Sequence, residues 1–171
     1  MAAKVEKNWI TLEETPQSGS LLMRVLQARG LETKAQMLAH LDYSLKNLSD
    51  PYELSGMREA VQRLAEAVRK GERVLIHGDF DVDGLTATAL MARILRSFGV
   101  DTECIIPNRL TEGYGISVPA VRRALAKKTA ELLLTVDCGI SAAAEIDELT
   151  GLGLEVIVTD HHECPVELPR A

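Results

Sequence analysis

From residue 74 onward, the sequence alternates short apolar runs with longer stretches of helical periodicity. The apolar runs are VLIHG (74–78), TECII (102–106), ELLLTV (131–136) and LEVIVT (154–159). The stretches between them predict helices at about 85–97, 118–128 and 142–150. Strands that are apolar on both faces, alternating with helices, are typical of a parallel sheet covered by helices on both sides. We therefore predict an α/β fold with a parallel sheet flanked by helices.

Residues 1–55 lack this alternation. We expect an extended start and then short helices at 21–29 and 33–40, the second beginning with a capping box from Thr33 and Gln36. The sequence thus predicts two regions, a short extended and helical N-terminal region over 1–55 and an α/β domain over 56–171. The α/β domain opens with an amphipathic helix closed by Gly71.

Three of the four predicted strands end in carboxylates or histidines. The first runs into HGDFDVDG, the third into DCG and the fourth into DHH. The carboxyl ends of parallel strands meet along one edge of an open α/β sheet, where ligands bind. Eight side chains should gather there: Asp79, Asp81, Asp83, Asp137, Asp160, His77, His161 and His162.

Such a concentration of negative charge needs a positive partner. Carboxylates a few ångströms apart repel one another by several kcal/mol at an effective dielectric constant of about 20. Two divalent cations bring four positive charges, and mixed carboxylate and imidazole ligands suit Mn²⁺, Mg²⁺ or Fe²⁺. Two such ions about 3.5–4 Å apart clamp a phosphoryl group during in-line attack. The strand ends therefore predict metal-assisted hydrolysis of phosphoesters.

The first acidic motif, HGDFDVDG, also resembles two other known motifs. The spacing of Asp79, Asp81, Asp83 and Gly84 matches half of an EF-hand loop, but the twelfth position is Leu90 instead of Glu. The same residues from Asp81 onward also resemble the nucleophile motif of haloacid-dehalogenase-type phosphatases. That family requires a later Lys and an acidic pair at strand ends, where this sequence has Asp-His-His.

Three simpler explanations take residues singly or in smaller groups. His77 could be a strand-end histidine bonded to the backbone. Cys138, Cys164 and either His161 or His162 have the chemistry of zinc ligands, but their spacing fits no common zinc pattern. Asp83 could cap the helix expected near residue 85. Capping accounts for one carboxylate and leaves the gathering at three strand ends unexplained.

Taken together, the ordered motifs resemble motifs one to three of the DHH phosphoesterase superfamily. These are His-x-x-x-Asp-x-Asp at 77–83, Asp137 after an apolar strand, and Asp-His-His at 160–162. Within that superfamily, the segment 77–99 and NRLTEGYGIS at 108–117 are similar to the RecJ family of 5′→3′ exonucleases specific for single-stranded DNA. The resemblance extends over most of residues 21–171.

The resemblance implies roles for the strand-end residues. It assigns His77, Asp81 and Asp137 to one metal ion, Mn²⁺ or Mg²⁺, and Asp83, Asp137 and His161 to a second. Among the catalytic residues, Asp79 and Asp160 would orient the imidazoles and water. His162 would face the phosphate as a donor or as an acid for the leaving oxygen.

The family also has a fourth motif with another metal-binding Asp, and a second domain that grips substrate through a glycine-rich motif. The sequence reaches Ala171, nine residues past His162, without them. We therefore expect the chain to be the N-terminal part of a longer protein. Its α/β domain is then C-terminally incomplete, and the second metal lacks a ligand.

The charge distribution leaves room for a nucleic acid. The net charge of −6 argues against a generally basic surface, but five of the acids belong to the expected metal site. The stretch from Arg109 to Lys128 carries five cations against Glu112 alone. We expect Arg109 to hold a terminal phosphate and Tyr114 to stack on a base.

These features predict a metal-dependent exonuclease of DNA repair and recombination that releases 5′-mononucleotides from single-stranded DNA. The alternatives are a phosphodiesterase of the same family acting on small nucleotides or pyrophosphate, and a catalytically silent fragment or scaffold. Expected partners are single-stranded DNA and repair proteins such as a helicase or a single-strand-binding protein. No apolar run reaches a membrane span, the N-terminus has no signal peptide, and three cysteines suggest no disulfide framework, so we expect a cytoplasmic protein.

Overall fold

The computed structural model describes residues 20–171, which belong to two compact units, Met1–Glu53 and Leu54–Ala171. The extended start expected for the first residues lies outside the described residues. In the first unit, the described part contains two helices and two single 3-10 turns: α1 (Leu21–Ala28), α2 (Lys34–Leu41), η1 (Leu45–Asn47) and η2 (Pro51–Glu53).

The predicted capping box starts α2. The Thr33 hydroxyl accepts a hydrogen bond from the Gln36 amide at 3.2 Å, and Gln36 Oε1 accepts one from the Thr33 amide at 2.8 Å. These two bonds satisfy amides that have no partner within the helix. This local signal was readable from two residues, and the structure confirms it.

The second unit is built on a four-stranded sheet in which every neighbouring pair is parallel, as predicted. The strands are β1 (Val74–Gly78), β2 (Thr102–Ile105), β3 (Leu132–Val136) and β4 (Glu155–Thr159). Their order is β2-β1-β3-β4. The chain moves outward from β1 to β2 and then crosses back to β3, so the order reverses between β1 and β3. In open α/β sheets, ligands bind beside such a reversal, at the carboxyl ends of the strands.

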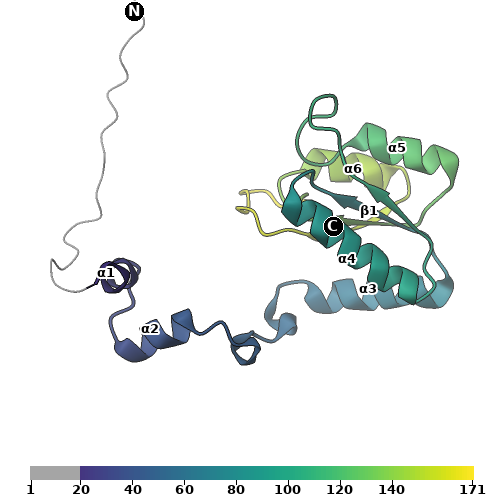
Figure 1. Ribbon diagram of the computed structural model, residues 1–171. Coiled ribbons are helices and arrows are strands. Elements are labelled where there is room, and N and C mark those ends of the chain that lie inside the picture. The colour runs from purple at the N-terminus through teal and green to yellow at the C-terminus, as the bar shows by residue number, and fades with distance from the viewer. Residues whose placement is uncertain (1–19) are drawn as a thin grey trace, which may run out of the picture. The chain divides into compact units, whose positions relative to one another are not determined.

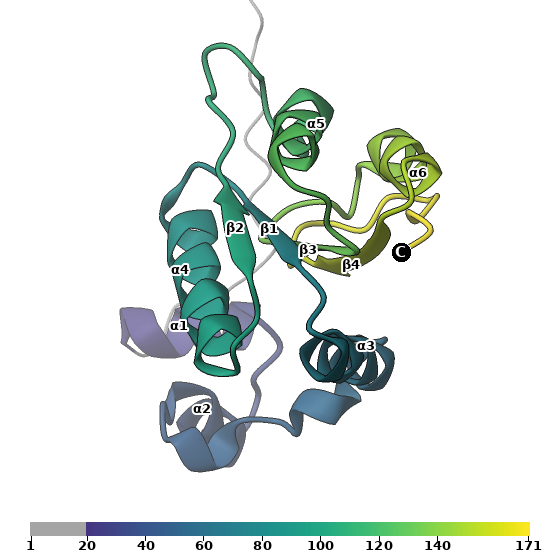
Figure 2. The same cartoon turned by 90° about the vertical axis from the view of Figure 1, so that its right-hand side faces the viewer.

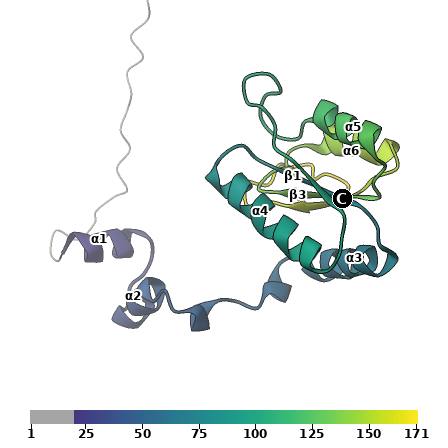
Figure 3. The same ribbon diagram turned by 45° about the vertical axis from the view of Figure 1, so that its right-hand side comes forward.

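Helices cover both faces of this sheet (Figures 1 and 3). Helices α3 (Met57–Lys70) and α4 (Val82–Ser97) pack on one face, and α5 (Val118–Lys127) and α6 (Ala143–Gly151) pack on the other. The crossovers containing α4 and α5 run in opposite directions, and right-handed connections then place their helices on opposite faces. Figure 2 shows the strands between the two helical layers.

The strands supply a core to each layer because successive side chains point to opposite faces. Leu75 and Leu133 belong to the core under α5 and α6. Ile76 and Leu134 belong to the core under α3 and α4. All four are at most 1% exposed, as expected for a sheet covered on both sides.

One expected helix cap is corrected. Helix α4 begins at Val82 because Asp81, and not Asp83, caps it: Asp81 Oδ1 accepts hydrogen bonds from the amides of Asp83 (3.0 Å) and Gly84 (3.1 Å). Helix α6 follows Ala142 and has no side-chain cap. Across residues 20–171, we find no helix with the length and apolar character needed to span a bilayer.

Candidate metal centre

Two glycines allow the first acidic motif to fold tightly after β1. A Cβ atom at Gly84 would overlap the backbone of Asp79, and one at Gly78 would overlap the Thr88 hydroxyl and the Gly84 carbonyl. Because neither position carries a Cβ, the first turn of α4 packs directly on the end of β1. This contact fixes the backbone on both sides of Asp79 and Asp81.

Backbone amides then orient the two carboxylates. The Asp79 side chain is buried, and its Oδ1 accepts a hydrogen bond from the Phe80 amide at 2.7 Å. Asp81 uses its Oδ1 to cap α4. Each carboxylate is therefore held by one oxygen, and its Oδ2 lies outside these bonds.

Asp137 is strained and buried at the end of β3. It has a φ of 61°, the one positive φ at a non-glycine position among residues 20–171, and its amide donates to the Thr159 carbonyl at 2.9 Å. Such backbone strain is often found at functional sites, and Asp tolerates it better than most residues. Neither carboxylate oxygen has a hydrogen-bond partner, although His161 Nε2 lies 2.9 Å from Oδ1. Burial, together with the charge of Asp81, raises the pKa of Asp137.

The strand-end residues form two clusters that share Asp137. Asp79, Asp81 and Asp137 each place a ligand atom within 4.8 Å of the others, and so do Asp137, His161 and His162. A buried carboxylate without hydrogen bonds, common to two groups of oxygen and nitrogen donors, matches what a pair of divalent ions requires. The donor set thus fits Mn²⁺ or Mg²⁺.

His77 lies outside both clusters, contrary to the ligand set expected from the resemblance. Its side chain is fully buried, its Nε2 accepts a hydrogen bond from the Ser117 amide at 3.0 Å, and its Nδ1 lies 3.7 Å from Cys138 Sγ. Burial lowers the pKa of His77 to about 4. The structure therefore places His77 as a neutral acceptor between β1 and α5, and Asp79 occupies the position beside Asp81 and Asp137.

Asp83 and the cysteines also lie outside the two clusters. Asp83 is exposed on the first turn of α4, where its amide bonds to Asp81. Cys138 is buried, and its burial raises the pKa of the thiol to about 12, so it stays protonated. Cys164 is exposed. The geometry therefore does not support a zinc site at these cysteines.

Asp160 orients His162, which belongs to the second cluster. Asp160 Oδ2 accepts a hydrogen bond from the Ile140 amide at 2.9 Å, and its Oδ1 accepts from the His161 and His162 amides and lies 2.7 Å from His162 Nδ1. Burial alone would raise the pKa of Asp160, but these bonds outweigh it and lower the pKa. The bond to Asp160 raises the pKa of His162. The pair fixes the orientation of the His162 ring through Nδ1.

The loop between β2 and α5 reaches this site. Tyr114 Oη lies 3.3 Å from His162 Nε2, and the Arg109 guanidinium lies over the ring of Phe80. A pocket of about 470 Å³ lies between Tyr114, the 138–142 segment and His162. Phe80 was not among the expected site residues, since its only signal in the sequence is its place between Asp79 and Asp81.

The cationic stretch that follows Arg109 is mostly neutralised within the fold. Its other four cations form ion pairs with carboxylates: Arg122 with Glu148, Arg123 with Glu112, Lys127 with Glu103 and Lys128 with Asp101. The local positive balance counted along the sequence therefore does not make a basic surface. Arg109 differs, since no carboxylate of residues 20–171 forms an ion pair with it.

The geometry agrees with a family model. The model described as "DHH family, N-terminal domain" matches residues 73–171, which include both clusters. The chain belongs to the DHH family. The resemblance predicted from the three motifs is thereby confirmed, and the parallel sheet flanked by helices is the DHH-type core that it implied.

Several DHH relatives carry the name "Single-stranded-DNA-specific exonuclease RecJ". The chain is 51% identical to the one from Thermus thermophilus over 109 residues, covering 64% of this chain and 16% of the relative. It is 37% identical to that of Bacillus subtilis over 166 residues (97% and 20%) and 41% identical to that of Escherichia coli over 152 residues (88% and 26%). The chain thus spans less than a third of the length of these relatives.

Solved structures agree with the fold. A structure described as exonuclease RecJ bound to manganese superposes with a TM-score of 0.62 at 49% identity, covering 68% of this chain and 30% of that one. RecJ from Thermus thermophilus in complex with Mn²⁺ also gives a TM-score of 0.62, at 38% identity, with coverage of 85% and 19%.

Proposed function

We propose that this DHH domain is the N-terminal part of the catalytic core of a metal-dependent exonuclease. The enzyme degrades single-stranded DNA from the 5′ end and releases 5′-mononucleotides. The observation that carries the proposal is the buried Asp137 carboxylate shared by two donor clusters. The RecJ relatives, named as exonucleases specific for single-stranded DNA, support the substrate class.

In this proposal, Asp79, Asp81 and Asp137 hold one divalent ion, and Asp137 and His161 hold the other. Divalent ions in such a site activate water and neutralise the charge of a phosphodiester. The hydrogen bonds of Asp79 and Asp81 to local amides keep their carboxylates oriented. The ligand set departs from the one expected for the family in using Asp79 instead of His77 and in leaving out Asp83.

His162 acts on the phosphate beside these ligands. Asp160 holds the ring through Nδ1 and raises the pKa of His162, which favours the protonated ring and its donor at Nε2. From that atom, His162 donates to the charge that develops on the phosphate, or protonates the leaving oxygen.

Arg109 binds a phosphate, and Tyr114 stacks on a base. The corresponding partners are single-stranded DNA and proteins that expose or coat it in the cytoplasm, such as a helicase or a single-strand-binding protein.

Nucleotide release from end-labelled DNA tests the proposal. A single-stranded oligonucleotide carries its label at the 5′ or the 3′ end and is incubated with Mn²⁺ or with EDTA. The 171-residue chain and a longer polypeptide that carries it are assayed in parallel. We expect Mn²⁺-dependent release of 5′-labelled mononucleotide in at least the longer polypeptide. Release only from the 3′ end, or hydrolysis of dinucleotides and pyrophosphate without attack on long strands, would contradict it and favour a small-substrate phosphodiesterase.

A further inference from the structure

Phe80 places an aromatic ring at the edge of the metal centre. It lies between Asp79 and Asp81 in the sequence, and its amide donates to Asp79 Oδ1 at 2.7 Å. Its backbone is therefore tied to the same turn that orients the two carboxylates. Any group that packs on the Phe80 ring is consequently held at a fixed place relative to the proposed metal ligands.

Two side chains of the loop between β2 and α5 pack on this ring. The Arg109 guanidinium carbon lies 4.8 Å from the ring centroid of Phe80, within cation–π distance. The Tyr114 ring meets Phe80 edge-on, with the centroids 6.3 Å apart and an interplanar angle of 76°. Both contacts bridge from the first acidic motif to a loop about 30 residues later in the chain.

Arg109 is available for a ligand. The neighbouring cations of the stretch pair with carboxylates, but no ion pair of Arg109 is found within residues 20–171. A guanidinium stacked on a ring keeps its N–H donors in its own plane, where they can bind two oxygens of a phosphate. The ring thus holds the cation without consuming its hydrogen bonds.

Tyr114 carries the contact on to His162. The two rings are 6.4 Å apart at 88°, and Tyr114 Oη lies 3.3 Å from His162 Nε2. Burial raises the pKa of Tyr114, and nearby negative charges raise it further. These charges belong to Asp79, Asp160, Asp137 and Asp81, so the Tyr114 hydroxyl lies close to the carboxylates of the metal centre. One continuous chain of contacts therefore runs from Arg109 through Phe80 and Tyr114 to His162.

We propose that Phe80 is a positioning residue that holds the Arg109 guanidinium beside the metal centre to bind a phosphate of the substrate strand, with Tyr114 as the second support. This inference rests on the proposed nuclease function. Phe80 itself touches neither phosphate nor metal. Its ring, and not merely an apolar side chain, is required, because the attraction comes from the aromatic face.

Phe80→Leu and Phe80→Tyr test the ring, measured in whichever polypeptide degrades DNA. In Phe80→Leu we expect KM for single-stranded DNA to rise about five-fold with kcat within about two-fold, and Phe80→Tyr to restore it. The slope of log KM against log salt should also fall by about 0.7, the value for one lost phosphate contact on a single strand. Phe98→Leu is the matched control, since Phe98 is the other phenylalanine of the sequence and lies exposed at the far end of α4.

Arg109→Lys tests the same contact from the loop. It keeps the charge but loses the planar group, so we expect a similar rise in KM, and Phe80→Leu should add little on the Arg109→Lys background. Mn²⁺ affinity, measured by calorimetry without DNA, should stay within two-fold in every variant. The inference would be overturned if the effects of Phe80→Leu and Arg109→Lys on KM were additive in the double variant. It would also be overturned if Phe80→Leu left the salt slope unchanged or weakened Mn²⁺ binding.

A binding measurement separates this inference from the proposed function. Fluorescence anisotropy with a single-stranded oligonucleotide in EDTA reports phosphate contacts without catalysis. If the wild-type protein hydrolyses no DNA with Mn²⁺, the proposed function fails. A five-fold weaker affinity and lower salt slope in Phe80→Leu still support the positioning role, and equal affinities of Phe80→Leu and wild type refute it.

Discussion

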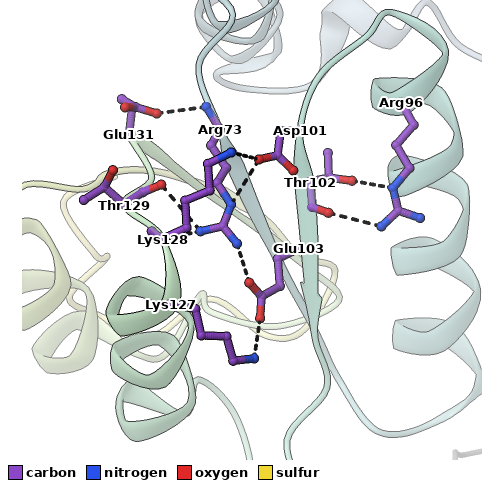
Figure 4. Close-up of polar contacts among 9 residues, drawn as sticks. All are labelled: Arg73, Arg96, Asp101, Thr102, Glu103, Lys127, Lys128, Thr129 and Glu131. Atoms are coloured by element: carbon purple, nitrogen blue, oxygen red, sulfur yellow. Dashed lines mark hydrogen bonds and ion pairs between the residues drawn. The ribbon is translucent and has the colours of Figure 1, made fainter.

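Within the described part of the chain, charged side chains gather at both ends of the sheet, but the carboxylates are paired with arginine and lysine only at the amino ends of the strands. At the amino ends of the strands, Arg73 is buried and its guanidinium contacts Asp101, Glu103 and the Lys128 carbonyl (Figure 4). Glu131 accepts a hydrogen bond from the Arg73 amide at 2.8 Å. At the carboxyl ends, Asp79, Asp81 and Asp137 converge, and the one ion pair found with them among residues 20–171 joins Asp137 to His161.

The difference distinguishes structural charges from functional ones. Lys127 and Lys128 complete the amino-terminal network, so every carboxylate there has a cationic or amide partner, and the pKa values of Asp101 and Glu103 are lowered, chiefly by the hydrogen bonds from these lysines. At the other end, the pKa of Asp137 is raised, because burial and a neighbouring carboxylate outweigh a histidine. One end is electrostatically complete within the fold, and in the proposed function the other is completed by a bound cation.

The largest effect should come from Asp137→Asn. It keeps the side-chain shape, and Asn also tolerates the positive φ, but it removes the carboxylate common to both clusters. We expect Mn²⁺ affinity to fall by more than about 100-fold and DNA hydrolysis by about 10³-fold or more. The free energy of unfolding without metal should rise, because the fold raises the pKa of Asp137 and therefore opposes its charged form, which the substitution removes. Calorimetry with Mn²⁺ and urea unfolding in EDTA measure the two effects.

Asp83→Asn is the comparison variant for that experiment. Asp83 is exposed on α4 and lies outside both clusters, so its Mn²⁺ affinity should change by less than about ten-fold. If Asp83→Asn lost as much Mn²⁺ affinity as Asp137→Asn, Asp83 would be a metal ligand, as the resemblance implies.

Arg73→Ala should produce the reverse pattern at the amino-terminal end. Removing the buried guanidinium takes a hydrogen bond from the Lys128 carbonyl and one of two cationic partners from Asp101 and from Glu103, so we expect the free energy of unfolding to fall by about 1.5–3 kcal/mol. Mn²⁺ affinity should remain within two-fold. Arg122→Ala, which breaks the exposed pair with Glu148, should cost less than about 1 kcal/mol in the same urea experiment. Equal losses in the two variants would show that the Arg73 network is no stronger than a surface pair.

Low pH should lower the free energy of unfolding because of His77, which is buried on β1. Its pKa is about 4 in the folded state, against about 6.5 when exposed, so the unfolded chain binds the extra proton between these values. Stability from this group is full above pH 6.5 and is lost as the pH falls toward 4, by on the order of 3 kcal/mol. Urea unfolding in EDTA from pH 7.5 to 4.5 measures the decline. His77→Gln should flatten it, and an unchanged slope in that variant would remove His77 as the cause.

The smallest effect should come from Asp160→Asn, which weakens the support of His162 without removing a proposed metal ligand. We expect kcat to fall about ten-fold. The pKa of His162 should fall when the negative partner is lost, and a group that acts in its protonated form loses activity as the pH rises through its pKa. The alkaline limb of the kcat profile should therefore move to lower pH. A limb that stays in place would assign the alkaline ionisation to another group.

Much of the architecture could be predicted because local patterns determine it. The apolar runs placed all four strands to within about a residue at each end, and the Thr33 capping box placed α2. The strand-end rule brought Asp79, Asp81 and Asp137 together, since a parallel sheet has its carboxyl ends along one edge.

Side-chain partners were decided by the tertiary structure. His77 and Leu75 are two residues apart on β1, so both point toward the α5 layer, where the Ser117 amide meets the imidazole. The stretch from Arg109 to Lys128 was counted as net positive, but three of the four carboxylates that pair with it, Glu103, Asp101 and Glu148, lie outside it in the sequence. Phe80 gained a partner only when the Arg109 loop folded over it. Periodicity specifies the path of the backbone, whereas charge pairing and ring contacts depend on which distant segments that path brings within a few ångströms.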